Sequence, residues 1–182
     1  RSKRHEAGDT IVRDAHFWFP LIALFTGMRR EEIGQLRIRN IKQTNGIYYF
    51  DLREGINLKT PQSARVIPVH PELIKIGFLD YIAELDTSEG IDFCLMNDCN
   101  SKATNPVNQY SKDFTRYLER INLKRDKIVF HSFRHNFKNA LNRARIDPER
   151  SKALMGHSDK SNSAHSNYGR AFEAEELYDD IC

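Results

Sequence analysis

The spacing of the hydrophobic positions divides this chain into helical and strand-like segments. Residues 14–26 are almost continuously apolar, which predicts a buried helix with Pro20 at its start or at a kink. Gly27 ends that run, and residues 29–36 read as a short second helix. From residue 71 the helical spacing returns, and one apolar stripe carries Leu73, Ile76, Leu79 and Ile82.

Between these helices the spacing changes to every second position, which is typical of strands. Leu36–Ile41 alternates apolar and polar residues, the pair at 45–46 (Asn-Gly) is a hairpin-turn signal, and residues 47–52 read as the return strand. Residues 65–69 predict a third strand, in which Pro68 suits an edge or an end. The middle of the chain therefore predicts a small three-stranded antiparallel sheet.

Further helices are predicted at about residues 106–121, 132–145, 148–155 and 173–181, after a polar loop near residues 92–101. Helices that flank one small antiparallel sheet give an α+β fold, so we expect a mostly helical α+β domain. We expect a single domain over residues 1–182, with residues 1–13 as an N-terminal tail or linker and residues 171–182 as a C-terminal tail helix.

Composition excludes several classes of protein. The 182 residues are 40% hydrophobic and 29% charged, which suits one globular domain with a core. No apolar run reaches the ~18 residues that a membrane helix needs. The three cysteines, Cys94, Cys99 and Cys182, form no C-x-x-C pair, which argues against a zinc site or a disulfide framework and fits a cytoplasmic setting. The chain begins without a Met, so we expect a fragment.

Positive charge is concentrated in one part of the sequence. The net charge is only +3, but basic residues dominate from residue 112 to residue 152, whereas residues 173–180 are mostly acidic. A basic body suggests a polyanionic partner, and the alternative is an ordinary solvated helical surface. The basic residues are Lys112, Arg116, Arg120, Lys124, Arg125, Lys127, Arg134, Lys138, Arg143, Arg145, Arg150 and Lys152.

Arg29 is the first candidate functional residue, at the start of the predicted second helix. Helix N-termini attract anions, and a guanidinium there adds a planar two-pronged donor for a phosphate. Glu32 is three positions further on, close enough to orient this arginine or to pair with it. Taken alone, the pattern is more often a helix elbow with a surface arginine.

Two further candidate sites lie on a loop and at a helix start. Lys59 precedes the third predicted strand, so it is placed on a hairpin loop from which a lysine can donate a proton, although most loop lysines have no such role. Ser132 is a good N-cap residue, which would direct His131 and Arg134 toward the positive end of the next helix. The simpler alternative is a capped helix with basic surface residues.

The last candidates follow the helix at 148–155. Gly156 reads as its left-handed cap, and a cap needs no histidine after it, so His157 is a candidate even though a surface histidine is the simpler interpretation. Tyr168 lies in a polar stretch with little apolar periodicity. A single tyrosine of this kind is usually a packing anchor.

The order of these motifs resembles that of the tyrosine recombinase (phage integrase) family. T-G-x-R-x-x-E around Arg29 is followed by a lysine on a hairpin, H-x-x-R-H, M-G-H and then a tyrosine, and the resemblance covers about His16 to Tyr168. Each motif is weak alone, but five in order and at sensible spacing are specific. The resemblance implies the catalytic domain of a site-specific recombinase or integrase from a phage or mobile element.

The resemblance also implies roles for two arginines and one lysine. Arg29 and Arg134 match the two arginines that clamp the scissile phosphate, and Lys59 matches the lysine that protonates the leaving 5′-oxygen. This agrees with the chemistry, because a phosphodiester under attack builds up negative charge on its non-bridging oxygens, which fixed guanidinium groups can balance. An alkoxide is a poor leaving group, so an acid is needed beside it.

The remaining three residues complete the implied site. His131 matches the histidine that assists proton transfer, His157 matches the one that hydrogen-bonds the phosphate, and Tyr168 matches the nucleophile that forms a 3′-phosphotyrosine link. The family needs no metal and no high-energy cofactor. Met155 replaces the usual Leu of its motif, and the interval from His157 to Tyr168 is slightly longer than the common one. Tyr178 in the acidic tail is interpreted as a packing residue.

The resemblance implies double-stranded DNA as partner, self-association on DNA as a tetramer in the synaptic complex, accessory DNA-bending proteins, no membrane, and a cytoplasmic location with the nucleoid. The separate N-terminal DNA-binding domain of the family has no room before His16. Two alternatives are a DNA-binding module that has lost catalysis and a related enzyme that relaxes supercoils or resolves DNA ends. For the amphipathic acidic tail we expect packing on a neighbouring subunit in the DNA-bound assembly; packing on its own domain is the alternative.

Overall fold

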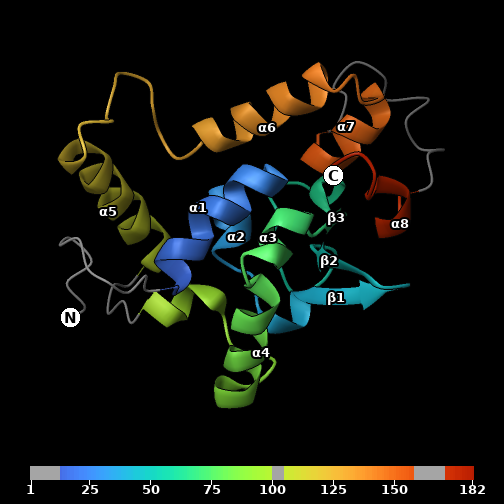
Figure 1. Cartoon of the computed structure of the whole chain (residues 1–182), viewed down its shortest axis with the longest axis horizontal. Coiled ribbons are helices and arrows are strands. Elements are labelled where there is room, and N and C mark those ends of the chain that lie inside the picture. The colour runs from blue at the N-terminus through green and yellow to red at the C-terminus, as the bar shows by residue number, and fades with distance from the viewer. Residues whose placement is uncertain (1–12, 100–104, 158–170) are drawn as a thin grey trace.

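Helices surround a small antiparallel sheet in this protein, which confirms the predicted α+β fold (Figure 1). A computed structural model describes residues 13–99, 105–157 and 171–182. The helices are α1 (Ala15–Thr26), α2 (Arg30–Ile33), α3 (Pro71–Lys75), α4 (Phe78–Glu89), α5 (Pro106–Arg120), α6 (Ser132–Arg143), α7 (Pro148–Met155) and α8 (Ala174–Leu177). The strands are β1 (Ile41–Thr44), β2 (Ile47–Asp51) and β3 (Val66–Pro68), and the 3-10 turns are η1 (Ile38–Asn40), η2 (Pro61–Ser63) and η3 (Leu95–Cys99).

The core is built around α1, the buried helix that the sequence predicts. Asp14 caps its start by accepting a hydrogen bond from the His16 amide at 3.0 Å, and the chain leaves the helix at Gly27 with φ of 62°. Pro20 lies inside the helix rather than at its start. Trp18 of α1 packs edge-on against Phe78 of α4, and both side chains are fully buried. This core fixes the end of α1, where the candidate site begins.

The sheet has the order β1-β2-β3, and all its pairs are antiparallel. The predicted hairpin turn is confirmed, because Asn45 and Gly46 both have positive φ, 46° and 81°. The first strand, predicted at Leu36–Ile41, is wrong in position: residues 38–40 form η1 and the strand begins at Ile41. The reason is Asn40, whose side chain accepts a hydrogen bond from the Arg37 amide at 2.9 Å and closes a turn there.

The continuous helix expected after residue 71 is interrupted. α3 and α4 are separate helices because Gly77 has φ of 96°, which a helix cannot contain. Pro68 ends β3, which pairs only with β2 and is thus an edge strand of the sheet, as predicted. Within the ranges that the structure covers, no helix has the length and apolar character required to cross a membrane.

The acidic tail packs on its own chain in this structure, and its docking on a neighbouring subunit in the DNA-bound assembly stays a prediction. α8 contacts β2 and β3 (Figure 1), and Leu177 and Ile181 are buried. Glu173 pairs with Arg53 at 3.4 Å, and Asp180 pairs with Arg150 at 2.6 Å. The helix is also shorter than the predicted 173–181. The burial of both apolar side chains anchors the tail to its own domain in this structure.

Candidate active site

Arg29 lies at the N-cap position of α2, in extended conformation just after the end of α1. Its side chain is 22% exposed, and its Nη1 donates to Glu32 Oε1 at 2.6 Å and to the Ser63 hydroxyl at 3.2 Å. The other carboxylate oxygen of Glu32 accepts from the Arg29 amide at 2.8 Å. The predicted pairing of Arg29 with Glu32 is therefore confirmed, and it holds the guanidinium at the start of the helix.

Arg134 lies in the first turn of α6, as the sequence predicts, but it is far more buried than a surface residue. The residue is 4% exposed, its Nη1 donates to the Gly27 carbonyl at 2.5 Å, and its Nη2 donates to the Met155 carbonyl. Burial, together with the charges of Arg29 and Arg65, lowers the pKa of Arg134 to about 10. Arg134 thus remains a cation at neutral pH.

The C-terminus of α7 brings the arginines together. Its last carbonyls have no partner within the helix and form the negative end of the helix dipole. Arg65 Nε donates to the Leu154 carbonyl at 2.9 Å, and Arg29 Nη2 donates to the Gly156 carbonyl at 3.2 Å. Arg134 takes the carbonyl between them, that of Met155. Three successive carbonyls therefore bind three different guanidinium groups.

Arg65 is a site residue that the sequence interpretation missed. It directly precedes β3, its side chain is 5% exposed, and its Nη2 donates to Glu32 Oε2 at 2.9 Å. Burial lowers the pKa of Arg65, whereas the hydrogen bond and the charge of Glu32 raise it. The available signal was a basic residue at the head of an apolar strand, flanked by Ala64 and Val66. Its partner Glu32 is too far away in the sequence for any local pattern to show the contact.

Both candidate histidines are exposed near the arginines. Burial and the charges of His135 and Arg134 lower the pKa of His131, and burial and the charge of Arg134 lower the pKa of His157. The prediction that Ser132 caps α6 is wrong: His131 holds the N-cap position. The Ser132 hydroxyl instead accepts a hydrogen bond from the Val129 amide at 3.1 Å, because residues 129–132 already form a turn.

Lys59 is exposed on the connection between β2 and β3, which is the predicted kind of loop. The same loop reaches the arginines through Ser63, whose hydroxyl contacts Arg29 and whose carbonyl accepts from Arg65 Nη1 at 2.8 Å. Tyr168 lies outside the residues that the structure describes. In the described ranges no group of three or more His, Cys, Asp or Glu side chains is placed to hold a metal ion.

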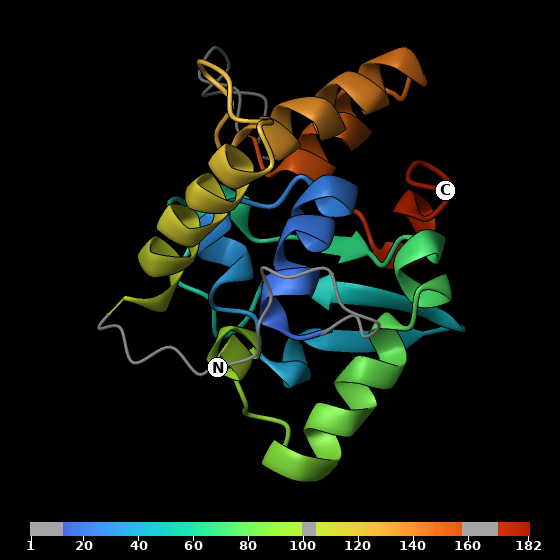
Figure 2. The ribbon, with the colours of Figure 1, turned by 60° about the vertical axis from the view of Figure 1, so that its left-hand side comes forward.

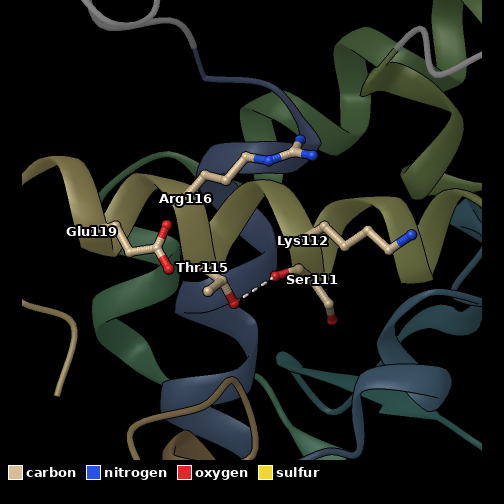
Figure 3. Close-up of a pocket in the computed structure, with 5 residues that line it drawn as sticks. All are labelled: Ser111, Lys112, Thr115, Arg116 and Glu119. Atoms are coloured by element: carbon tan, nitrogen blue, oxygen red, sulfur yellow. Dashed lines mark hydrogen bonds between the residues drawn. The ribbon is translucent and has the colours of Figure 1, made fainter. Parts of the chain in front are cut away.

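α5 lies alongside α1 (Figure 2), and it carries the exposed residues Lys112, Arg116 and Arg120. Arg30, the residue after Arg29, donates to the Ser111 hydroxyl of α5 at 2.8 Å, so this helix is joined to the element that positions Arg29. Lys112 and Arg116 extend from α5 at an open hollow of the surface (Figure 3). The hollow is lined by Ser111, Lys112, Thr115, Arg116 and Glu119.

Solved structures resemble this fold. XerH site-specific recombinase bound to difH substrate, in a pre-cleavage complex, is 25% identical over 86% of this chain and 43% of that chain, with a TM-score of 0.60. Its post-cleavage complex with palindromic difH is 26% identical over 79% of this chain and 39% of that chain, with a TM-score of 0.57. The Tn1549 transposon integrase with transposon right-end DNA is 23% identical over 84% and 53%, with a TM-score of 0.61.

The chain spans less than half the length of XerH. A comparison with curated proteins gave no match. The sequence model described as the phage integrase family matches residues 9–174, which include all six residues singled out by the sequence motifs. The chain therefore belongs to the phage integrase family.

Proposed function

We propose that this chain is the catalytic domain of a site-specific DNA recombinase, which cuts and rejoins double-stranded DNA through a 3′-phosphotyrosine intermediate. The observation that carries the proposal is the convergence of Arg29 and Arg134 on the end of α7, beside His131 and His157. Fixed guanidinium groups of this kind suit the charge that develops on a phosphodiester under attack. The DNA in the XerH complexes supports the same substrate.

Each residue has one task in this mechanism. The Tyr168 hydroxyl attacks the scissile phosphorus, and neutral His131 assists removal of its proton, since a tyrosine with a pKa near ~10 is mostly protonated at neutral pH. Arg29, Arg134 and His157 stabilise the charged phosphorane-like transition state. Lys59 donates a proton to the leaving 5′-oxygen. Reversal of these steps on a second strand joins the new DNA ends.

The proposed function extends to assembly on DNA and to location in the cell. We propose that copies of the protein associate on DNA as a tetramer in the synaptic complex, with accessory DNA-bending proteins, in the nucleoid of the cytoplasm. α5 suits the contact with DNA because its exposed face carries Lys112 and Arg116 next to the site. The family resemblance implies this assembly, and the DNA substrate in the XerH complexes supports the contact with DNA.

Covalent capture on DNA of random sequence tests the chemistry and identifies the recognised site in one experiment. A pool of nicked duplexes with a randomised segment is incubated with the protein, and denatured protein–DNA adducts are isolated and sequenced. We expect the wild-type protein to select one sequence, and Tyr168→Phe to bind that sequence equally well but give no adduct. EDTA should leave the adduct yield unchanged.

The same experiment separates the alternatives. A DNA-binding module without catalysis would enrich a sequence by binding but give no adduct with the wild-type protein. An enzyme that only relaxes supercoils or resolves ends would form the adduct but would not join two different duplexes that carry the selected site. An adduct that survives in Tyr168→Phe would move the nucleophile to another residue, with Tyr178 tested next.

A further inference from the structure

Arg65 is buried between three segments of the chain, and its side chain makes several hydrogen bonds. Its Nε donates to the Leu154 carbonyl of α7 at 2.9 Å. Its Nη1 donates to the Ser63 carbonyl at 2.8 Å and to Glu32 Oε1 at 3.3 Å, and its Nη2 donates to Glu32 Oε2 at 2.9 Å. A guanidinium has five N–H donors, so these contacts leave little capacity for a bound phosphate. Arg65 can therefore affect a phosphate through its neighbours.

The first route from Arg65 to the phosphate site runs through Glu32. Both carboxylate oxygens of Glu32 are shared: Oε1 accepts from the guanidinium groups of Arg29 and Arg65, and Oε2 accepts from the Arg29 amide and from Arg65. The two-pronged contact with Arg65 fixes the plane of the carboxylate. Because Arg29 is hydrogen-bonded to the same carboxylate, the orientation of its guanidinium depends on Arg65.

The second route runs through the end of α7. The carbonyl that Arg65 holds, that of Leu154, directly precedes the carbonyls that bind Arg134 and Arg29, those of Met155 and Gly156. A Cβ atom added to Gly156 would lie 2.6 Å from Arg65 Nη1, which shows how closely this turn fits the guanidinium. Displacement of Arg65 would therefore shift the carbonyls that hold both candidate clamp arginines.

We infer that Arg65 is a positioning residue of the phosphate clamp, which holds Arg29 and Arg134 in their reactive arrangement without touching the phosphate. The inference rests on the proposed function. Stability alone is a weak explanation for this pair, because replacement of a buried ion pair by apolar residues of similar size is often neutral or stabilising. Loss of the arrangement should slow cleavage about 10²-fold at saturating DNA, the scale for a misplacement of about 1 Å.

The test uses variants that separate positioning from folding. Arg65→Met removes every contact of Arg65 but leaves Glu32 with Arg29 as its partner, so a change at Arg29 reports the loss of Arg65 and not the loss of Glu32. Arg65→Lys keeps the charge but loses the two-pronged geometry, so it should not restore the rate. Arg53→Lys is the matched control, because it alters an arginine that makes the same kind of two-pronged contact, to buried Asp51 of β2, outside the arginine cluster.

The first measurement needs no DNA. Nitrogen-15 NMR of the arginine side chains reports the hindered rotation of a guanidinium that is fixed by hydrogen bonds. We expect the Arg29 signal to lose this hindrance in Arg65→Met and to keep it in Arg53→Lys, while both variants remain folded by circular dichroism. An Arg29 guanidinium that is as ordered in folded Arg65→Met or folded Arg65→Lys as in the wild-type protein would overturn the inference.

The second measurement compares single-turnover cleavage of two forms of the captured DNA site, one with a normal scissile phosphate and one with an uncharged methylphosphonate. A positioning defect in the clamp should slow cleavage of the charged phosphate far more than that of the neutral analogue, with unchanged DNA affinity. Equal slowing of both would indicate a merely structural role. If the wild-type protein forms no adduct with any DNA, the proposed function fails instead, and the NMR result still decides the role of Arg65.

Discussion

Gly27 and Gly156 are placed where a side chain would disturb the arginines. Both have positive φ, 62° and 59°, which L-residues with a Cβ adopt only with strain. The Gly27 carbonyl accepts from Arg134, and a Cβ at this position would lie 2.4 Å from Cδ1 of Phe137. The Gly156 carbonyl accepts from Arg29. These glycines are therefore part of the site, because they allow the backbone to approach the guanidinium groups.

We expect Gly156→Ala to destabilise the domain and to slow DNA cleavage. The new methyl group must displace Arg65 Nη1, which lies 2.6 Å from the ideal Cβ position. Overpacking of this kind typically adds about 1–3 kcal/mol to the cost of the strained φ. Gly46→Ala is the control, since Gly46 also has positive φ but nothing lies within 4 Å. Equal losses of unfolding free energy in the two variants would show that contact with Arg65 is unimportant.

Arg134→Lys should reduce single-turnover cleavage by about 10²-fold or more, the scale for removal of one transition-state donor. A lysine keeps the charge but cannot bridge the Gly27 and Met155 carbonyls, which Arg134 holds with two different nitrogens. Arg29→Lys should give a similar decrease. Unchanged DNA affinity in a gel-shift assay is the control, and a cleavage rate close to that of the wild-type protein would contradict the clamp assignment.

The rate of cleavage should fall on mild acidification. Burial and nearby positive charge lower the pKa of His131 and that of His157 below the ordinary value of 6.5, so both rings are neutral at pH 7. As the pH falls below 6.5 and through the lowered pKa of His131, the ring becomes protonated. Protonated His131 can no longer accept the proton of the nucleophile, so cleavage should slow. A pH–rate profile at saturating DNA tests this, with His131→Gln expected to lose the acidic inflection. Persistence of that inflection in the variant would contradict the role.

Local spacing was enough to predict some contacts of the site and insufficient for others. Arg29 and Glu32 are three residues apart at a helix start, so their pairing could be predicted from helix geometry. Arg65 meets Glu32 and the Leu154 carbonyl, which are 33 and 89 residues away in the sequence. Such contacts form only in the complete tertiary structure, so the spacing of residue types along the sequence cannot predict them.

Among the elements, the end of α7 holds the arginines of the site, and the tail docks on the sheet. The predicted ranges of α5, α6 and α7 agree with the structure to within about two residues, and a proline at the start of α5 and of α7 favours a helix there. Strand β1 and the α3–α4 break were not predicted correctly, because an asparagine side chain and a glycine φ decide them. The docking of α8 depends on burial against β2 and β3, which is again a tertiary effect.

The tail is expected to stabilise its own domain. Leu177 is 1% exposed in α8, so Leu177→Ala should lower the unfolding free energy by about 2–4 kcal/mol through lost burial and a cavity. Glu175→Ala, in the same helix but hydrogen-bonded to Thr44 and Asn45 at the surface, should lower it far less. Denaturant titration measures both. A stable Leu177→Ala variant with weakened cooperative DNA binding would instead support packing of the tail on a neighbour.

For the whole molecule, the fold class could be predicted from alternating spacings alone, but the arrangement of charge could not. The sequence places many basic residues between positions 112 and 152, and the structure divides them between two uses. Lys112 and Arg116 lie on the exposed face of α5, whereas Arg134 is buried among backbone carbonyls. Burial therefore distinguishes the solvent-exposed basic residues from those of the site. Because burial depends on the tertiary structure, the sequence alone could not predict this division.

The arginine cluster also has a consequence for folding. Arg29, Arg65 and Arg134 bring three positive charges to the end of α7 and Glu32 brings one negative charge, a sum of 3 − 1 = +2. Besides burial, the charge of Arg29 lowers the pKa of Arg65 and that of Arg134, so the three groups repel one another in the protein without DNA. This repulsion opposes folding, and an anion bound at the cluster relieves it.

Anion binding and unfolding are therefore linked, because a ligand that binds only the folded state stabilises it by RT ln(1 + [L]/Kd). The melting temperature should rise more with sulfate or inorganic phosphate than with chloride at equal ionic strength, and this excess should shrink in Arg134→Gln. An equal excess in the variant would place the bound anion elsewhere. If the proposed function holds, the charge that suits the cluster to a phosphodiester also lowers the stability of the domain without DNA, and bound DNA would restore it.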